Sequence, residues 1–376
     1  MNIEVVSLRS LQRLFSIVPA IWLLAACGIP GSPVMTPITL PETTPVTLPT
    51  AISPHEGLSG NEVKTLNSLK KVDDHPLYTM HYYGDYIAGV SDNVSNRKVP
   101  VTDQPVKEPS SSGTNWACSL FAALGNKADL FYGRNFDWDY SPALLLFTDP
   151  PGGYASVSMV DIAYLGIEGK SAKTLLNLPF EERQLLLDAP SLPFDGMNER
   201  GLVIGMAAVP AGQMLPDPAR VTIGSLLVIR NILDHAKDVN EAVAIIQSYN
   251  IDMEGGPPLH YLIADASGAA ALVEFHLGEM VVIPNENPWL QATNFLQTAS
   301  NDTGEGRCWR YDQLYHQLNQ VDGKVTILEA MRLLESVSQD ITQWSIVYGI
   351  SNGSVNIVMG RGYDKTYTFH LDPFSR

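Results

Sequence analysis

The alternation of apolar and polar residues predicts a chain rich in β-strands from residue 119 onward. Segments with this pattern are separated by clusters of Gly, Pro, Asn, Asp and Ser, which favour turns. The predicted strands are residues 119–124, 129–138, 154–160, 201–206, 261–263, 271–273, 344–348, 355–359 and 367–371. Turn sequences at 265–268 and 352–353 predict that the strands beside them pair as hairpins.

Helical periodicity interrupts the strands in three places. Residues 223–236 carry apolar side chains along one broad face. Two further helices, 242–249 and 330–337, follow capping sequences at 238–241 and 326–329, in which a polar residue precedes Glu by three positions. Because the helices are grouped between groups of strands, the pattern favours an α+β fold in layers over a doubly wound parallel sheet.

The N-terminal residues have the pattern of an export signal. Arg9 and Arg13 precede an uncharged stretch, 14–26, that is shorter than the roughly 20 residues needed to span a bilayer. We interpret residues 1–26 as a signal peptide. The small residues before Cys27 resemble the bacterial lipobox, which predicts a lipid on the Cys27 sulfur and an exported lipoprotein of the bacterial cell envelope, at the outer face of the cytoplasmic membrane or in the periplasm. The alternative is a buried cysteine in an apolar helix.

Two segments separate this signal from the strand-rich part. Residues 27–60 are rich in Pro and Thr, with a proline at every fourth position from 33 to 49. This composition favours an extended tether between a lipidated Cys27 and the folded protein. Residues 61–117 combine a tyrosine-rich, strand-forming stretch at 78–86 with a polar run at 108–113. We interpret them as a pro-segment or small subunit.

Composition and missing motifs exclude several classes of function. The chain has 24 basic and 40 acidic residues, a formal charge of −16, so nucleic acid is not an expected partner. Metal-binding and phosphate-binding spacings are absent, as is the Gly-x-Ser-x-Gly elbow of many hydrolases. The eight histidines are scattered, and His260 has the surroundings of a hydrogen-bonded core residue. We therefore expect no metal and no cofactor.

Candidate chemistry gathers around Cys118. A nucleophilic thiolate needs a lowered pKa, which a nearby guanidinium provides, and a base to take its proton. Arg134 and Asp137 follow Cys118 by 16 and 19 residues. They are three positions apart, so on a regular strand they face opposite sides. The spacing alone therefore does not place both side chains at the thiol.

The segment from Cys118 resembles the start of mature enzymes of the choloylglycine hydrolase family. These linear amide C–N hydrolases include bile salt hydrolases, penicillin V acylases and, more distantly, acid ceramidase-like enzymes. The Cys is followed at matching distances by a Gly-Arg-Asn-x-Asp segment, and similar stretches follow in order at 195–202, 292–295 and 306–310. The resemblance covers residues 118–376 and implies a four-layer αββα N-terminal-nucleophile hydrolase fold of antiparallel sheets.

The resemblance also implies catalytic roles. Cys118 becomes the nucleophile, and its own α-amino group, freed by cleavage after Ala117, becomes the base, since an α-amine titrates near pH 8. Asp137 holds that amine and Arg134 favours the thiolate. Asn294 offers its side-chain N–H to the tetrahedral oxyanion.

Further positions complete the predicted site. Arg307 enters its polar network, with Arg310 as the competitor for that place. Weaker candidates for the substrate pocket are Leu145, Phe147, Asn198 and Ala208. Many bile salt hydrolases and penicillin V acylases have Asn or Tyr where this chain has Ala208, which offers only its backbone N–H. The resemblance therefore assigns neither bile salts nor penicillin V as substrate.

Each of these residues also has a structural interpretation. Cys118 fits a buried apolar position, and Arg134 with Asp137 fits an ordinary ion pair. Asn294 fits a turn, and the two later arginines fit the exposed start of a helix.

We expect a lipid-anchored, extracytoplasmic hydrolase of linear amides that acts through a cysteine acyl-thioester on a small-molecule N-acyl amide. The alternatives are an acyltransferase of the same fold and a non-catalytic surface binding lipoprotein. The sequence is compatible with a monomer and with a homo-oligomer.

Overall fold

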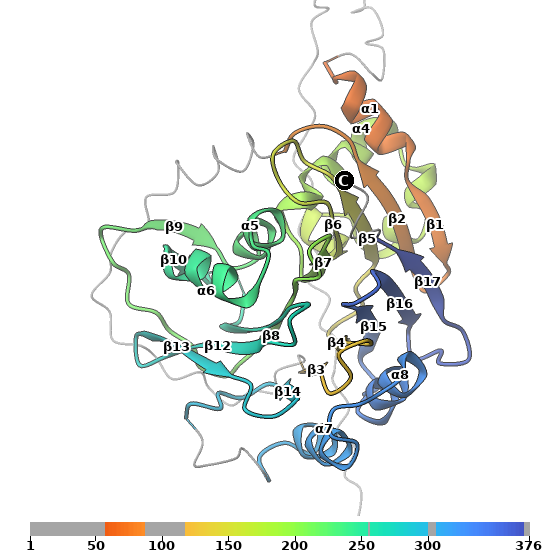
Figure 1. The fold of residues 1–376 in the computed structure, drawn as a ribbon. Coiled ribbons are helices and arrows are strands. Elements are labelled where there is room, and N and C mark those ends of the chain that lie inside the picture. The colour runs from red at the N-terminus through yellow and green to blue at the C-terminus, as the bar shows by residue number, and fades with distance from the viewer. Residues whose placement is uncertain (1–56, 87–116, 255, 300–305, 372–376) are drawn as a thin grey trace, which may run out of the picture. The chain divides into compact units, whose positions relative to one another are not determined.

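The computed structural model describes residues 57–86, 117–254, 256–299 and 306–371. Cys27, the signal peptide and nearly all of the tether lie outside the described residues. Within this part of the chain, two large β-sheets pack against each other and helices cover their outer faces (Figure 1). In the described residues, none of the helices has both the length and the apolar composition to cross a membrane.

The larger sheet has nine strands in the order β1-β2-β5-β6-β7-β8-β11-β12-β13. Neighbouring strands are antiparallel except β2 and β5, which run parallel through six residue pairs. The strands are β1 (Lys70–Asp73), β2 (Leu77–Tyr82), β5 (Ala143–Thr148), β6 (Ser156–Asp161), β7 (Asp195–Asn198), β8 (Val203–Ala208), β11 (Leu259–Ala264), β12 (Ala270–His276) and β13 (Glu279–Pro284). The segment before residue 87 thus supplies two strands of this sheet.

The second sheet has six strands in the order β14-β3-β4-β15-β16-β17, all antiparallel. They are β3 (Ala117–Ala123), β4 (Phe131–Asp137), β14 (Trp289–Ala292), β15 (Thr342–Gly349), β16 (Ser354–Met359) and β17 (Tyr367–His370). A separate parallel pair, β9 (Val221–Gly224) and β10 (Tyr249–Asp252), stands beside the larger sheet.

The helices form the two outer layers. On the nine-stranded sheet lie α1 (Gly60–Asn67), α5 (Leu227–His235), α6 (Val239–Gln247), the short helices α3 (Gly169–Lys173) and α4 (Phe180–Arg183), and the 3-10 turns η1 (Ile162–Leu165), η2 (Leu175–Asn177) and η3 (Gln184–Ser191). On the six-stranded sheet lie α7 (Trp309–Gln320) and α8 (Ile327–Ser336). The result is the predicted α+β arrangement in four layers.

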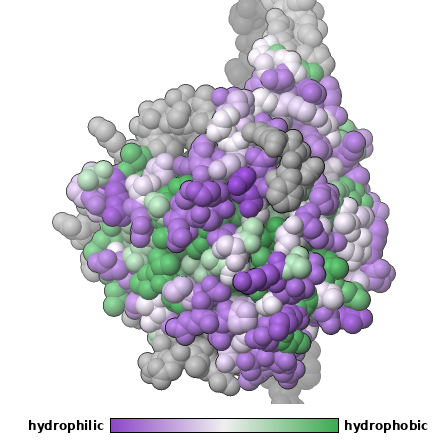
Figure 2. All heavy atoms as spheres, viewed as in Figure 1, coloured by the Kyte–Doolittle hydropathy of each residue, from purple (hydrophilic) through white to green (hydrophobic). Residues whose placement is uncertain are grey.

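Three apolar clusters hold the layers together. The largest fills the space between the sheets, where Leu120 and Trp344 of the smaller sheet join Leu145 and Val203 of the larger one. A second lies under α1 and the short helices, and a third between the smaller sheet and α7 and α8. Figure 2 shows that hydrophobic residues (green) also reach the surface across the middle of the face drawn, between hydrophilic areas (purple).

Most predicted elements match within a few residues, but the predicted helix 223–236 was wrong at its start. Residues 221–224 form β9, and the helix begins at Leu227. The apolar residues there satisfy a helical period, but Ile223 is held by parallel pairing with Ile251, a contact distant in sequence. The capping sequence at 326–329 is confirmed, because Thr326 and Glu329 bond each other's backbone.

Candidate active site

Cys118 lies in β3 on the face turned toward the larger sheet. It is paired across the strands with Phe136 of β4, and only 2% of its surface is exposed. Burial raises the pKa of its thiol, while the positive charge of Arg134 acts in the opposite direction. The cysteine nevertheless lines a pocket and is therefore reachable from it.

Arg134 lies in β4, two residues from Phe136 and on the same face as the thiol. Its Nη2 is 4.0 Å from Cys118 Sγ, and its Nη1 donates to the carbonyl of Phe194 at 2.7 Å. Nη1 also pairs with the Asp195 carboxylate, and both side chains are fully buried. The guanidinium is thus fixed by a carboxylate and a carbonyl while one edge remains directed at sulfur.

Asp137 lies on the opposite face of β4, as its three-residue distance from Arg134 predicts. Its position in the register is opposite Ala117, the residue before the candidate nucleophile. Gln339 donates to its carboxylate at 2.9 Å, and Thr342 donates to the other oxygen. Burial raises its pKa to about 6. The two charged residues therefore flank Cys118 from opposite faces: Arg134 at the side chain and Asp137 at the backbone.

Asn294 and Arg310 hold the backbone of Cys118 itself. The Cys118 N–H donates to Asn294 Oδ1 at 2.6 Å, and Asn294 Nδ2 donates to the carbonyl of Ala208 at 2.7 Å. Arg310 Nη1 donates to the carbonyl of Cys118 and, at 3.0 Å, to Ser119 Oγ. Its Nη2 donates to Asn294 Oδ1 at 3.0 Å, and Nη1 is 4.0 Å from the Asp137 carboxylate. Arginine and asparagine thus fix the peptide groups on both sides of the Cys118 Cα.

Arg310, and not Arg307, occupies the place predicted in the polar network. Arg307 is exposed, and its guanidinium reaches the carbonyl of Ala299 at 3.5 Å. Arg310 follows by three residues as the second residue of α7, where the helix packs against β3 and the side chain is buried. The structure thus brings Arg310, and not Arg307, to Cys118.

Three of the four weaker pocket candidates lie elsewhere. Leu145 is fully buried between the sheets as part of β5, and Phe147 stacks on His81 at the far end of that strand. Asn198 donates to the carbonyls of Leu233 and Ala236 and accepts from the backbone of the turn that follows it. These residues have structural roles. Ala208, by contrast, lines the pocket beside Cys118.

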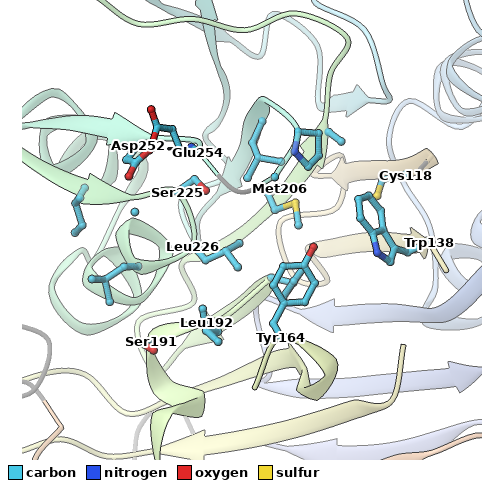
Figure 3. Close-up of a pocket in the computed structure, with 18 of the residues that line it drawn as sticks. Cys118, Trp138, Tyr164, Ser191, Leu192, Met206, Ser225, Leu226, Asp252 and Glu254 are labelled. Carbon is cyan, nitrogen blue, oxygen red and sulfur yellow. Dashed lines mark hydrogen bonds between the residues drawn. The ribbon is translucent and has the colours of Figure 1, made fainter. Parts of the chain in front are cut away.

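The pocket has a volume of about 350 Å³ and runs from Cys118 toward the β9–β10 pair. Its wall near the thiol is aromatic and apolar, with Phe136, Trp138 and Met206. Figure 3 shows Tyr164 and Leu226 farther along, and Asp252 and Glu254 at the end opposite Cys118. The volume is at the small end of the range for ligand sites, and the mixture of apolar wall and few polar groups is typical of them.

Several residues of this pocket were not found from the sequence. Tyr164, Leu226 and Asp252 come from three distant segments, and no local pattern links them to Cys118. Trp138 ends the predicted strand that carries Arg134, so its proximity to Arg134 in the sequence could have marked it. Asp195, the buried partner of Arg134, begins the stretch 195–202 noted above. The second thiol, Cys308, is half-buried at the start of α7, and both cysteines in the described residues are free.

Residues 118–294 match the sequence profile of the linear amide C-N hydrolases, choloylglycine hydrolase family. Over this region the chain is similar to that family. The match begins at Cys118 and ends at Asn294, the residue that accepts the Cys118 N–H.

Solved structures of the family have a similar fold. A variant of conjugated bile acid hydrolase from Clostridium perfringens superposes with a TM-score of 0.50 at 15% identity, over 68% of this chain and 92% of that one. Penicillin V acylase from Agrobacterium tumefaciens gives 0.47 at 16% identity, over 69% and 88%. At 15% identity, the superposition on the bile acid hydrolase establishes the fold alone.

A curated relative of unknown activity also matches. An uncharacterized protein of Paramecium bursaria Chlorella virus 1 is 34% identical over 100 residues, which are 24% of this chain and 36% of the viral protein. The alignment thus spans about a third of the relative's length.

Proposed function

We propose that the protein hydrolyses linear, non-peptide amide bonds of small N-acyl substrates, with Cys118 as nucleophile. The observation that carries the proposal is the constellation around this residue: its thiol faces both Arg134 and the pocket, while its backbone is bonded by Asn294 and Arg310. A cysteine that served only as core packing would not require its backbone and side chain to meet three polar residues.

In turnover, the free α-amine of Cys118 takes the thiol proton, and the thiolate attacks the amide carbonyl carbon. The carbon–sulfur bond forms, negative charge develops on the carbonyl oxygen, and the carbon–nitrogen bond then breaks as the leaving amine receives the proton. Water hydrolyses the resulting acyl-thioester to a carboxylic acid and restores the thiol. Arg134 favours the thiolate by its charge, and the Asn294 side-chain amide is the proposed donor to the oxyanion.

Activation precedes turnover, because in the uncleaved chain the Cys118 nitrogen is part of a peptide bond. We propose that Cys118 Sγ attacks the Ala117 carbonyl carbon, that the carbon–nitrogen bond breaks, and that the thiol proton passes to the departing nitrogen. Hydrolysis of the thioester leaves a carboxylate on Ala117 and an amine on Cys118. Asp137 is the proposed partner of the new ammonium group, which its register position opposite Ala117 supports.

The N-terminal segment is proposed to stay bound after this cleavage. Strand β2 pairs with β5 through six residues inside the nine-stranded sheet. The Tyr86 hydroxyl donates to the buried Asp234 carboxylate at 2.9 Å, and Asp73 meets Lys365 and Tyr367 near the C-terminal strand β17. Removing β2 would expose a long sheet edge and the apolar cluster under α1. A retained subunit keeps the enzyme on the lipid anchor proposed at Cys27.

Intact mass and N-terminal sequencing of purified protein test the nucleophile and the activation together. We expect a new N-terminus at Cys118 in the wild type and an uncut chain in Cys118→Ala. A panel of N-acyl amides should be hydrolysed by the wild type only. An uncut wild type that is inactive on every amide, as Cys118→Ala is, would favour a binding protein. Transfer of the acyl group to an added amine at low concentration would favour an acyltransferase.

A further inference from the structure

The charged residues that line the pocket disfavour the binding of an anionic substrate group. No Lys, Arg or His is among the described residues that line it, and its ionisable lining residues besides Cys118 and Tyr164 are the carboxylic acids Asp252 and Glu254. The chain as a whole carries a formal charge of −16, which adds a repulsive field for anions. An anionic substituent inside this pocket would therefore lose its hydration without gaining a counter-charge from the described lining residues.

The arginines near Cys118 do not supply that counter-charge. Arg134 is fully buried and already paired with Asp195, and it lies behind Cys118 and Met206 instead of lining the cavity. Arg310 bonds the Cys118 carbonyl on the other side of β3, close to Asp137. Both cations are directed at the protein's own groups.

The apolar wall defines what the pocket does accept. Between Cys118 and the two acids the lining is aromatic or aliphatic, with Trp138, Leu226 and Leu259 among its members. Figure 3 shows the acids separated from the thiol by this wall. Such a lining stabilises an uncharged hydrocarbon group by burial, at about 25 cal/mol per Å² removed from water.

We propose that the pocket selects an apolar group of the amide substrate whose far end, beside Asp252 and Glu254, is neutral or positively charged, and that it rejects substrates with an anionic far end. This inference rests on the proposed function in one respect, that the pocket beside Cys118 is the substrate site. The expected preference follows from Asp252 and Glu254 in the lining of this pocket.

Matched amides test the charge preference. One set shares a chromogenic amine and has straight acyl chains of increasing length that end in methyl, ammonium or carboxylate; a second set carries the same three ends on the amine side. We expect the carboxylate compounds to have kcat/KM at least about tenfold below their methyl and ammonium counterparts in the set whose variable part enters the pocket. Carboxylates that are hydrolysed equally well or better in both sets would overturn the proposal.

Variants of the two acids locate the effect. Asp252→Asn combined with Glu254→Gln should reduce the discrimination between ammonium and carboxylate by about three- to tenfold, since exposed ion pairs are weak. Asp322→Asn is the control, because it removes one exposed negative charge that does not line the pocket. An equal loss of discrimination in this control would indicate a general charge effect and contradict the assignment to the pocket.

Binding to Cys118→Ala separates this proposal from the proposed activity. The quenching of Trp138 fluorescence reports pocket occupancy, with Trp138→Phe as the reference because the chain has six tryptophans. Tighter binding of methyl and ammonium compounds than of carboxylates supports the charge preference even if no compound is hydrolysed. Tighter binding of the carboxylates overturns it even if hydrolysis is observed.

Discussion

Asn294 joins the two sheets beside the nucleophile, because its side chain accepts from the Cys118 N–H at 2.6 Å and donates to the Ala208 carbonyl at 2.7 Å. Cys118 belongs to β3 of the smaller sheet and Ala208 to β8 of the larger one. A single amide therefore contacts the nitrogen that is proposed as the base and the strand that carries Ala208 of the pocket wall. Both its acceptor and its donor have a task in the proposed reaction.

Replacing Asn294 by Asp separates these two tasks. Asp retains an oxygen that accepts from the Cys118 N–H and from Arg310, but when ionised it has no N–H for Ala208 or for an oxyanion. We expect Asn294→Asp to be cleaved before Cys118 and to lose about a hundredfold in kcat. Mass spectrometry and initial rates measure the two effects. A variant with normal kcat would exclude Asn294 as the oxyanion donor.

The Arg134–Asp195 pair predicts different effects on stability and on thiol reactivity. Because both groups are fully buried, Asp195→Asn or Arg134→Met alone should lower the free energy of unfolding by about 3–5 kcal/mol. The double variant Arg134→Met with Asp195→Leu should recover most of this loss, yet its Cys118 thiol lacks the guanidinium and has a higher pKa. Urea unfolding and alkylation at neutral pH measure the two properties. Faster alkylation of the double variant would contradict the role of Arg134.

The two late arginines form a matched pair of variants. Arg310→Met removes the donors to the Cys118 carbonyl and to Asn294, and should abolish cleavage or slow it by at least about tenfold. Arg307→Met removes an exposed charge and should leave the rate of cleavage unchanged. It should alter the free energy of unfolding by no more than about 0.5 kcal/mol. The time course of cleavage by mass spectrometry compares them. The reverse result would restore Arg307 to the site.

Tyr86 tests how the N-terminal segment is held. Its hydroxyl donates to Asp234, which is also paired with Arg230 at 2.7 Å. Tyr86→Phe removes one buried hydrogen bond and should destabilise the association of the cleaved segments by about 1 kcal/mol. Tyr83→Phe is the control, because its half-buried ring stacks under Lys64 and keeps that contact. Dilution of the cleaved protein into urea, followed by gel filtration, measures release. Equal release from both variants would contradict this role of Tyr86.

The pattern of apolar and polar residues predicted most helices and strands well, because each of these elements has a recognisable pattern within a short stretch of sequence. The strand around Cys118, the strand that carries Arg134 and the cap at Thr326 depend on neighbours in sequence. Strand β9 did not follow its pattern, since its conformation depends on pairing with β10, 28 residues later at each matched position. Tertiary contact overrode a helical period there.

The candidate site could be predicted only as far as its motifs extend. The spacing from Cys118 to Arg134 and Asp137 left open how both side chains could lie near the same cysteine. In the structure they lie on opposite faces of β4, with Arg134 near the thiol and Asp137 near the backbone. The motif did not separate Arg310 from Arg307; Arg307 precedes α7 and is exposed, whereas Arg310 is the second residue of the helix and is buried. The acids at the far end of the pocket, Asp252 and Glu254, have no sequence signature. Single acidic residues of this kind are common on protein surfaces, so nothing in the sequence links these two to Cys118.

The raised pKa of Asp137 predicts how stability changes with pH in the uncleaved chain. Burial raises this pKa from 3.8 to about 6, so the folded state binds the proton more tightly than the unfolded state. The stabilisation by the protonated carboxyl, about 3 kcal/mol, is full below about pH 4 and is lost as pH rises through about 6. Urea unfolding of Cys118→Ala across this range should show the loss, and adding Asp137→Asn should remove that share. Identical pH profiles for the two chains would contradict it.

Asp161 provides the matched control for this pH dependence, because burial raises its pKa to about 6 as well and it lies in β6, outside the contacts of Cys118. Asp161→Asn should flatten the pH profile equally in cleaved and uncleaved chains. Asp137→Asn should do so only in the uncleaved chain. Asp137 is opposite Ala117, next to the Cys118 nitrogen, so the ammonium group expected after cleavage should lower the pKa of this carboxyl, and the proton should no longer be retained near neutrality. If the two variants behaved alike in the cleaved protein, Asp137 would not be the residue that holds the amine.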